Sequence, residues 1–154
     1  KYLNNNYCCF VFKIENAIFT RYGGNLRKVM KWDLVYLSNP DYLRVTVYEQ
    51  FTLKEQIQMF EEILAIEEWT SGVPILFDNR QLEMKDIDSS TIENSVIIMQ
   101  NFCRQHSETK IVGLVNQGLN FGLGRQFETI VEIKGNARFR IFKDENIALN
   151  WLLT

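Results

Sequence analysis

The segment Val73-Pro74-Ile75-Leu76-Phe77-Asp78-Asn79-Arg80 is the most informative part of this chain for its fold class. Its apolar part, Val73–Phe77, is continuous, which is typical of a central strand that is covered on both faces. Such strands belong to largely parallel sheets, in which helices connect neighbouring strands and cover them. The polar residues Asp78-Asn79-Arg80 mark the predicted end of the strand. The rest of the sequence should therefore alternate between strands and helices.

The residues ahead of this strand predict a hairpin followed by a helix. Leu34–Leu37 is a short apolar run, and Ser38-Asn39-Pro40-Asp41 consists of residues that favour tight turns. Tyr42–Gln50 alternates apolar and polar residues, as a half-buried strand does. A T-x-x-E capping box at Thr52 then begins a helix that should reach about Trp69. The spacing places four residues on its inward face: Leu53, Ile57, Phe60 and Leu64.

The strand at Val73–Phe77 should lead into a second helix. Residues 79–88 are predicted to form a polar connection, and an S-x-x-E capping box at Ser90 marks the start of the helix. An apolar stripe at helical spacing follows it: Ile92, Val96, Met99 and Cys103.

Two further strands and two helices complete the predicted domain. Ile111–Val115 is another buried strand, and Gly118–Gly124 opens a third helix that Gly135 should close. Ala137–Phe142 is the last strand, and Asp144 should cap a short final helix. The inward residues expected here are Leu123, Phe127, Ile130, Val131, Phe139, Ile141, Ile147, Ala148, Trp151 and Leu152.

The predicted order from residue 32 is therefore β-β-α-β-α-β-α-β-α. It indicates an α/β domain over residues 32–154 with a mixed, largely parallel sheet flanked by helices. Residues 1–31 carry six positive charges and one negative charge, and they do not fit this pattern. We expect them to be an N-terminal extension that either supplies extra strands, at Cys8–Ile14 and Ile18–Tyr22, or is a non-native leader.

Composition excludes several classes of protein. The chain has 154 residues and a net charge of −2, distributed as +3, −7 and +2 over residues 1–50, 51–100 and 101–154, which argues against a nucleic-acid binder. No apolar stretch approaches the roughly 20 residues that a membrane-spanning helix needs. Three cysteines, an odd number, suit a reducing compartment, so we expect a cytoplasmic protein. One histidine and no Cys-x-x-Cys motif give no set of zinc ligands, and we expect neither a metal nor a cofactor.

Three segments of the C-terminal half carry a family resemblance. They are Phe121–Glu128, Phe139–Asp144 and Ala148–Leu152, and Ile75–Arg80 adds a strand that ends in Asp-Asn-Arg. Together they resemble small bacterial STAS-like proteins, which are related in fold to the anti-sigma-factor antagonists and are described as STAS/SEC14-domain proteins. The resemblance covers residues 32–154. It implies a mixed sheet flanked by helices, a cytoplasmic location, no obligatory cofactor, and a role in binding a partner or a small ligand.

The first candidate site is Ser89 and Ser90 at the start of the second helix. The resemblance implies a regulatory serine here, because anti-sigma-factor antagonists carry a phosphorylatable serine in a similar Asp-Ser-Ser-Gly stretch. A phosphate would be favoured by the helix dipole. Thr91 replaces the glycine, however, and Asp86 and Asp88 would repel a phosphate. The alternative is that Ser90 only caps the helix.

The second candidate site is the loop 116–125, which follows a strand and opens a helix. Backbone N–H groups at such a position can bind an anion, with Arg125 in the first turn. The glycines Gly122 and Gly124 match neither dinucleotide-binding nor Walker spacing. The alternative is tight packing of the helix on the sheet, with Gly122 at the close approach and Arg125 on the surface.

A third candidate lies beyond the end of the strand at Asp78. Open α/β sheets bind ligands outside the carboxyl ends of their strands, and Arg80, Asn116 and Arg125 would converge there. The alternative is an ion pair of Asp78 with Arg80 or Arg125 that only fixes the loop.

No set of nucleophile, base and orienting group is evident in the sequence. His106 lies at a predicted helix end, where a capping or exposed role is expected, and Cys103 lies on an apolar stripe. The leading functional expectation is a non-catalytic regulatory module that interacts with another protein or with a second copy of itself. The alternative is a carrier of a small lipid-like or anionic ligand, and an enzyme ranks third.

Overall fold

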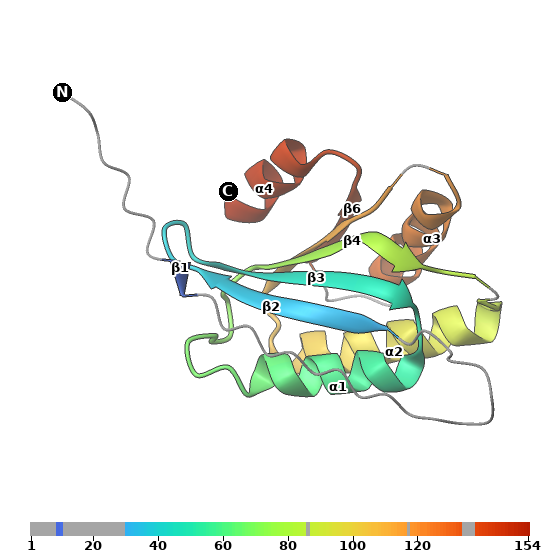
Figure 1. Ribbon diagram of the computed structural model, residues 1–154, viewed down its shortest axis with the longest axis horizontal. Coiled ribbons are helices and arrows are strands. Elements are labelled where there is room, and N and C mark those ends of the chain that lie inside the picture. Colours follow the sequence, from blue (N-terminus) through green and yellow to red (C-terminus); the bar gives the residue numbers. More distant parts are fainter. Residues whose placement is uncertain (1–8, 11–29, 86, 117, 134–137) are drawn as a thin grey trace.

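The computed structural model describes residues 9–10, 30–85, 87–116, 118–133 and 138–154, which form one mixed sheet with helices on both faces (Figure 1). The sheet has six strands in the order β1-β2-β3-β4-β5-β6. The elements are β1 (Cys9–Phe10), β2 (Lys31–Leu37), β3 (Tyr42–Gln50), α1 (Leu53–Leu64), β4 (Ile75–Glu83), α2 (Ser89–Gln105), β5 (Lys110–Leu114), α3 (Leu119–Ile133), β6 (Arg138–Phe142) and α4 (Glu145–Leu153).

The predicted fold class and element order are confirmed. Strands β1, β2 and β3 pair antiparallel, and β3, β4, β5 and β6 pair parallel, each parallel step being made through a helix. The sheet begins before residue 32, since β2 starts at Lys31 and Met30 is buried in the core. Apart from Cys9, Phe10, Met30 and Lys31, the proposed N-terminal extension lies outside the described residues.

Two hydrophobic cores lie on opposite faces of the sheet. Helices α1, α2 and α3 cover the larger core, whereas α4 covers a smaller one that contains Leu76, Val112 and Leu152. Figure 1 shows α1 and α2 along one face and α4 across the other. Alternation along β4 supplies both cores, because Ile75 and Phe77 point to one face and Leu76 to the other.

Helix α1 begins where predicted, but its inward face and its end differ from the prediction. The hydroxyl of Thr52 accepts a hydrogen bond from the Glu55 N–H, as the capping box requires. The buried side chains are Gln56, Met59, Phe60 and Ile63, whereas Ile57 and Leu64 are about half exposed. Two apolar stripes compete in this helix, and packing selects the one that brings Met59 and Ile63 to the sheet. The helix ends at Leu64, and Trp69 is buried in the following loop, where its Nε1 donates to the Val73 carbonyl at 3.2 Å.

Strand β4 continues to Glu83, through residues that the sequence predicts as a polar connection. The cause is a β-bulge. Thr46 lies opposite Asp78, but Tyr48 lies opposite Gln81, so β4 holds one extra residue between these pairs. The bulge shifts the alternation by one residue, and Asn79 and Leu82 therefore both face α1–α3. A strand that changes phase in this way has no regular pattern in the sequence.

The cap of α2 also differs from the prediction. Asp88 is the N-cap and its carboxylate accepts from the Thr91 N–H at 2.7 Å, so Ser90 does not cap the helix. The predicted stripe is confirmed, since Ile92, Val96, Met99 and Cys103 are all buried.

The last two helices match the sequence in most respects. Asp144 caps α4, and Ala148 and Leu152 are buried, but Ile147 is 59% exposed. Ile147 lies at the edge of the inward face that the spacing along α4 predicts, and packing leaves its side chain in solvent. In α3, Val131 is buried as predicted. The predicted terminal Gly135 lies outside the described residues.

Two glycines other than Gly122 bring the backbone close to a side chain of the sheet. A Cβ at Gly122 would meet nothing within 4 Å, which corrects the prediction that this glycine marks the contact of helix and sheet. A Cβ at Gly124 would lie 3.3 Å from Ile141 Cγ2, and one at Gly113 would lie 2.5 Å from Ile141 Cδ1. Ile141 therefore occupies the space that two glycines leave.

We expect Gly113→Ala to lower the free energy of unfolding by about 1 kcal/mol, because its methyl group displaces Ile141 in a packed core. Gly122→Ala is the matched control. It adds a methyl group to an exposed helix position with free space, and it should raise stability by roughly 0.5–1 kcal/mol. Urea unfolding measures both values, and equal effects of the two substitutions would contradict this packing.

Candidate functional site

An apolar pocket of about 100 Å³ lies between the sheet and helices α1, α2 and α3. Its wall includes all four methionines of the sequence, and we call it the methionine pocket: Met30, Met59, Met84 and Met99. Five phenylalanines complete much of the wall: Phe51, Phe60, Phe77, Phe127 and Phe139. Methionine is flexible and polarisable, so such a wall adapts its shape more easily than one of branched side chains.

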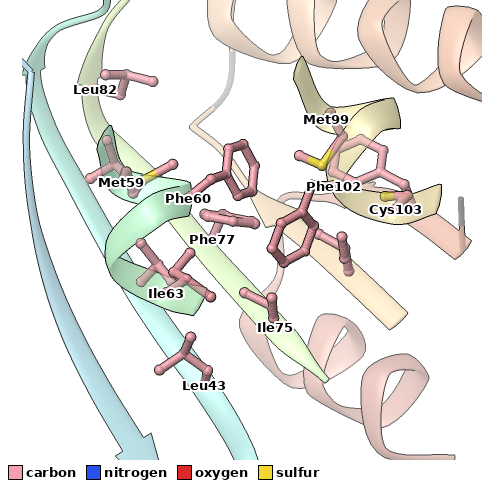
Figure 2. Close-up of a cluster of buried hydrophobic side chains, with 14 of the residues drawn as sticks. Leu43, Met59, Phe60, Ile63, Ile75, Phe77, Leu82, Met99, Phe102 and Cys103 are labelled. Carbon is pink, nitrogen blue, oxygen red and sulfur yellow. The ribbon is translucent and has the colours of Figure 1, made fainter. Parts of the chain in front are cut away.

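Figure 2 shows how the elements meet beside this pocket. Met59 and Phe60 point from α1, and Met99 points toward them from α2, with Phe77 of β4 between the helices. The Phe60 and Phe77 rings meet edge to face, with centroids 5.8 Å apart. Beyond the bulge, Leu82 faces the same side. The irregular register of β4 thus lengthens the pocket wall.

Three polar side chains interrupt the apolar wall: Gln56, Ser95 and Asn79. Gln56 is 5% exposed and Ser95 is 6% exposed. The Gln56 Nε2 donates to the Ser95 carbonyl at 3.5 Å, whereas the Gln56 Oε1 has no hydrogen-bond partner among the described residues. A hollow with an apolar wall and a few polar groups is the usual form of a small-molecule site.

A cluster of four charges lies on the opposite face of the sheet, under the first turn of α4. Arg44 of β3 bonds to Asp78 of β4 at 2.5 Å and to Glu145 of α4 at 2.6 Å. Arg80 bonds to the same two carboxylates, at 2.6 and 3.0 Å. The Asp78 side chain is only 7% exposed, so both arginines are needed to hold its charge in the protein.

The ionisation of this cluster follows from these contacts. Burial alone would raise the pKa of Asp78, but the hydrogen bonds from Arg80 and Arg44 outweigh burial and hold the pKa below its ordinary value. The hydrogen bond from Arg44 likewise lowers the pKa of Glu145. The hydrogen bond to Asp78 raises the pKa of Arg80. The four groups thus stay ionised at neutral pH and sum to no net charge.

The structure brings together only two of the three residues expected to converge beyond Asp78. The side-chain amide of Asn116 donates to the Arg80 carbonyl. No hydrogen bond or ion pair joins Arg125 to Arg80 or Asn116, and its guanidinium pairs instead with Glu128 at 2.6 Å. Of the two predicted ion pairs of Asp78, the one with Arg80 forms and the one with Arg125 does not. Gly124 lies on the wall of the methionine pocket, and Gly122 is exposed.

Glu128 is a buried carboxylate that the sequence prediction missed. Its Oε2 accepts from the Ile141 N–H at 3.1 Å, and its side chain is 2% exposed. The Phe142 carbonyl faces β5, where it accepts from the Val115 N–H, so the Ile141 amide faces away from β5. Glu128 therefore caps the outer edge of β6. The sequence does contain a signal for the burial of Glu128, because this residue falls on the same helical arc as the inward residues Phe127 and Val131.

The remaining predicted residues lie on or near α2. Ser89 and Ser90 are exposed in its first turn. His106 is its C-cap, and the His106 ring packs against Trp69 at 4.9 Å between centroids. Burial raises the pKa of the Cys103 thiol to about 11, so this thiol is a poor nucleophile at neutral pH.

No group of three or more His, Cys, Asp and Glu side chains is placed to hold a metal ion in the part of the chain that the structure describes. None of the helices described is long and apolar enough to cross a membrane.

The charge cluster predicts a specific loss of stability in acid. Because the pKa values of Asp78 and Glu145 are lowered in the folded state, their stabilisation is present above their ordinary values of 3.8 and 4.5 and is lost as the pH falls through the lowered values. Arg44→Met should cost about 1.5–3 kcal/mol at pH 7, the range of a hydrogen bond to a charged group. It should also reduce the stability difference between pH 7 and pH 3.

Urea unfolding across this pH range makes the measurement. Lys85→Met is the control, because its ion pair with Glu83 is largely exposed and should contribute little. An Arg44→Met variant with the pH dependence of the wild type would show that the cluster does not act in this way.

Comparison with known proteins supports the fold. The sequence matches no protein-family model and no curated protein. The structure is similar to the crystal structure of an uncharacterised protein of the DUF3478 family with a SpoIIAA-like fold, from Shewanella loihica PV-4. The TM-score is 0.51 and the identity 18%, and the match covers 86% of this chain and 99% of the other. This chain therefore has the SpoIIAA-like, or STAS, fold that the sequence motifs predict.

Proposed function

We propose that this protein is a non-catalytic binding module of the STAS-like type that holds a small, mainly apolar molecule in the methionine pocket. The observation that carries the proposal is the composition of the pocket wall. All four methionines, which are separated by as many as 69 positions between Met30 and Met99, meet around one hollow together with five phenylalanines. We therefore rank the carrier alternative above the interaction module that the sequence favours.

The size of the pocket limits the ligand. A cavity of about 150 Å³ that is lined by Leu, Ile and Phe stays dry and binds benzene. The methionine pocket, with about 100 Å³, is smaller than that cavity, so a molecule of one ring or a short chain is the largest ligand that it should admit without rearrangement. A lipid-like ligand with a long chain would require the methionine side chains to change rotamer, and the proposal is therefore confined to the smaller class.

The charge cluster does not favour an anionic ligand. Arg44 and Arg80 are each bonded to both Asp78 and Glu145, so an anion would have to displace a carboxylate that is already well paired. Arg125 is committed to Glu128. The apolar pocket is thus the better supported site of the two kinds considered.

Toluene is a suitable first probe for the proposal. Titration of the protein with toluene should shift the methionine methyl signals in carbon–proton NMR spectra, because all four methionines line the pocket. Leu123→Trp places a larger side chain at a half-buried position of the wall and should weaken binding about tenfold or more. Ile97→Trp, on the exposed side of α2, should leave the affinity unchanged. Methionine signals that do not move at saturating toluene would refute the proposal.

An interaction module is the second candidate function, and the first turn of α2 favours it. Because Asp88 caps the helix, the exposed hydroxyls of Ser89 and Ser90 are not needed for capping. The helix dipole favours a phosphate there, although the charge of Asp88 opposes one. Such a switch would act in the cytoplasm, where the free thiol of Cys103 stays reduced.

Intact-protein mass spectrometry of the protein from its own cells tests this second function. A mass increase of one phosphoryl group that survives denaturation and is absent in a Ser89→Ala, Ser90→Ala variant would support it. Unmodified protein under all growth conditions would count against it.

A further inference from the structure

We infer that the ligand of the methionine pocket is an amphipathic one-ring molecule with a hydroxyl or N–H donor, which pairs with the Oε1 of Gln56. This inference rests on the proposed function and deepens it by naming the ligand class. It starts from Gln56, a polar residue on the buried face of α1, where the neighbouring inward positions are Met59, Phe60 and Ile63.

Each end of the Gln56 amide has a different environment. Its Nε2 donates to the Ser95 carbonyl, and its Oε1 has no partner among the described residues. A rotated amide would place the oxygen against the Ser95 carbonyl, and two acceptors repel one another. The contact with the Ser95 carbonyl, although long at 3.5 Å, thus favours this orientation of the amide, and the group that remains available is an acceptor. An acceptor in an apolar wall selects a donor.

A buried acceptor is unfavourable unless it finds a donor. A buried polar atom without a partner loses its hydrogen bonds to water and gains none in return. A ligand with a donor restores the bond, whereas an apolar ligand of equal size does not. Sites built to bond a donor reject analogues that lack one for this reason.

The experiment compares phenol with toluene, which has the same number of non-hydrogen atoms but no donor. The dissociation constants of both are measured from the methionine methyl signals, with the wild type, Gln56→Leu and Gln56→Met. The two ligands are compared by the ratio of the dissociation constant of toluene to that of phenol. A neutral hydrogen bond corresponds to a few-fold to about tenfold in affinity. We expect both Gln56 substitutions to lower the ratio by that factor.

Gln58→Leu is the matched control, because it makes the same substitution two residues along α1. Gln58 donates to Glu62 and is not on the pocket wall, so the ratio should equal that of the wild type. The Gln56→Met variant keeps the length of the side chain and guards against a loss of folding in Gln56→Leu.

The possible failures are distinct. If toluene and phenol both shift the methionine signals but the ratio is the same with and without Gln56, the donor inference is overturned and the proposed function stands. If neither probe shifts them in the wild type, the proposed function fails, and the inference fails with it.

Discussion

The register of β4 is the constraint on which both faces of this molecule depend. From Ile75 to Asp78 the side chains alternate, so that Ile75 and Phe77 enter the core under α1–α3 while Leu76 and Asp78 enter the layer under α4. After Asp78 the bulge adds one residue and reverses the alternation. Asn79 and Leu82 then both line the methionine pocket, and Arg80 stays with the charge cluster. Without the bulge Leu82 would face the other side of the sheet.

The two faces consequently differ in how completely they are filled. On the α4 face, the carboxylates of Asp78 and Glu145 and the guanidinium groups of Arg44 and Arg80 satisfy one another. On the other face, long flexible methionines and planar phenylalanines surround a hollow, and a buried glutamine oxygen lacks a partner among the residues described. Binding capacity is expected where packing and hydrogen bonding are incomplete, and this comparison assigns it to the face under α1–α3.

The sequence predicts the order of the elements well because that order depends on local signals. Continuous apolar runs identify β4 and β5, and side chains at Thr52 and Asp144 identify two helix starts. The prediction for the inward face of α1 is wrong because two apolar stripes overlap in this helix, and only contacts with the sheet decide which of them is buried. The predicted end of β4 is wrong because a bulge interrupts the periodic pattern by which a strand is recognised in a sequence.

The candidate site was less predictable, because distant residues form it. Arg44 and Glu145 are 101 positions apart and meet only through the order of the sheet. The four methionines are likewise dispersed along the chain, and no local pattern relates Met30 to Met84. The rule for parallel strands correctly predicts that Asn116 and Arg80 lie together. The position of Arg125 could not be predicted, because its partner Glu128 lies on a helical arc of otherwise apolar residues.

The hollow among the methionines should admit a ligand. A crystal structure determined under xenon pressure tests it most directly, because xenon enters apolar cavities without needing a particular chemistry. We expect xenon density inside the pocket, against Met59, Met99 and Phe127. A structure in which these side chains fill the space and no xenon binds would contradict it.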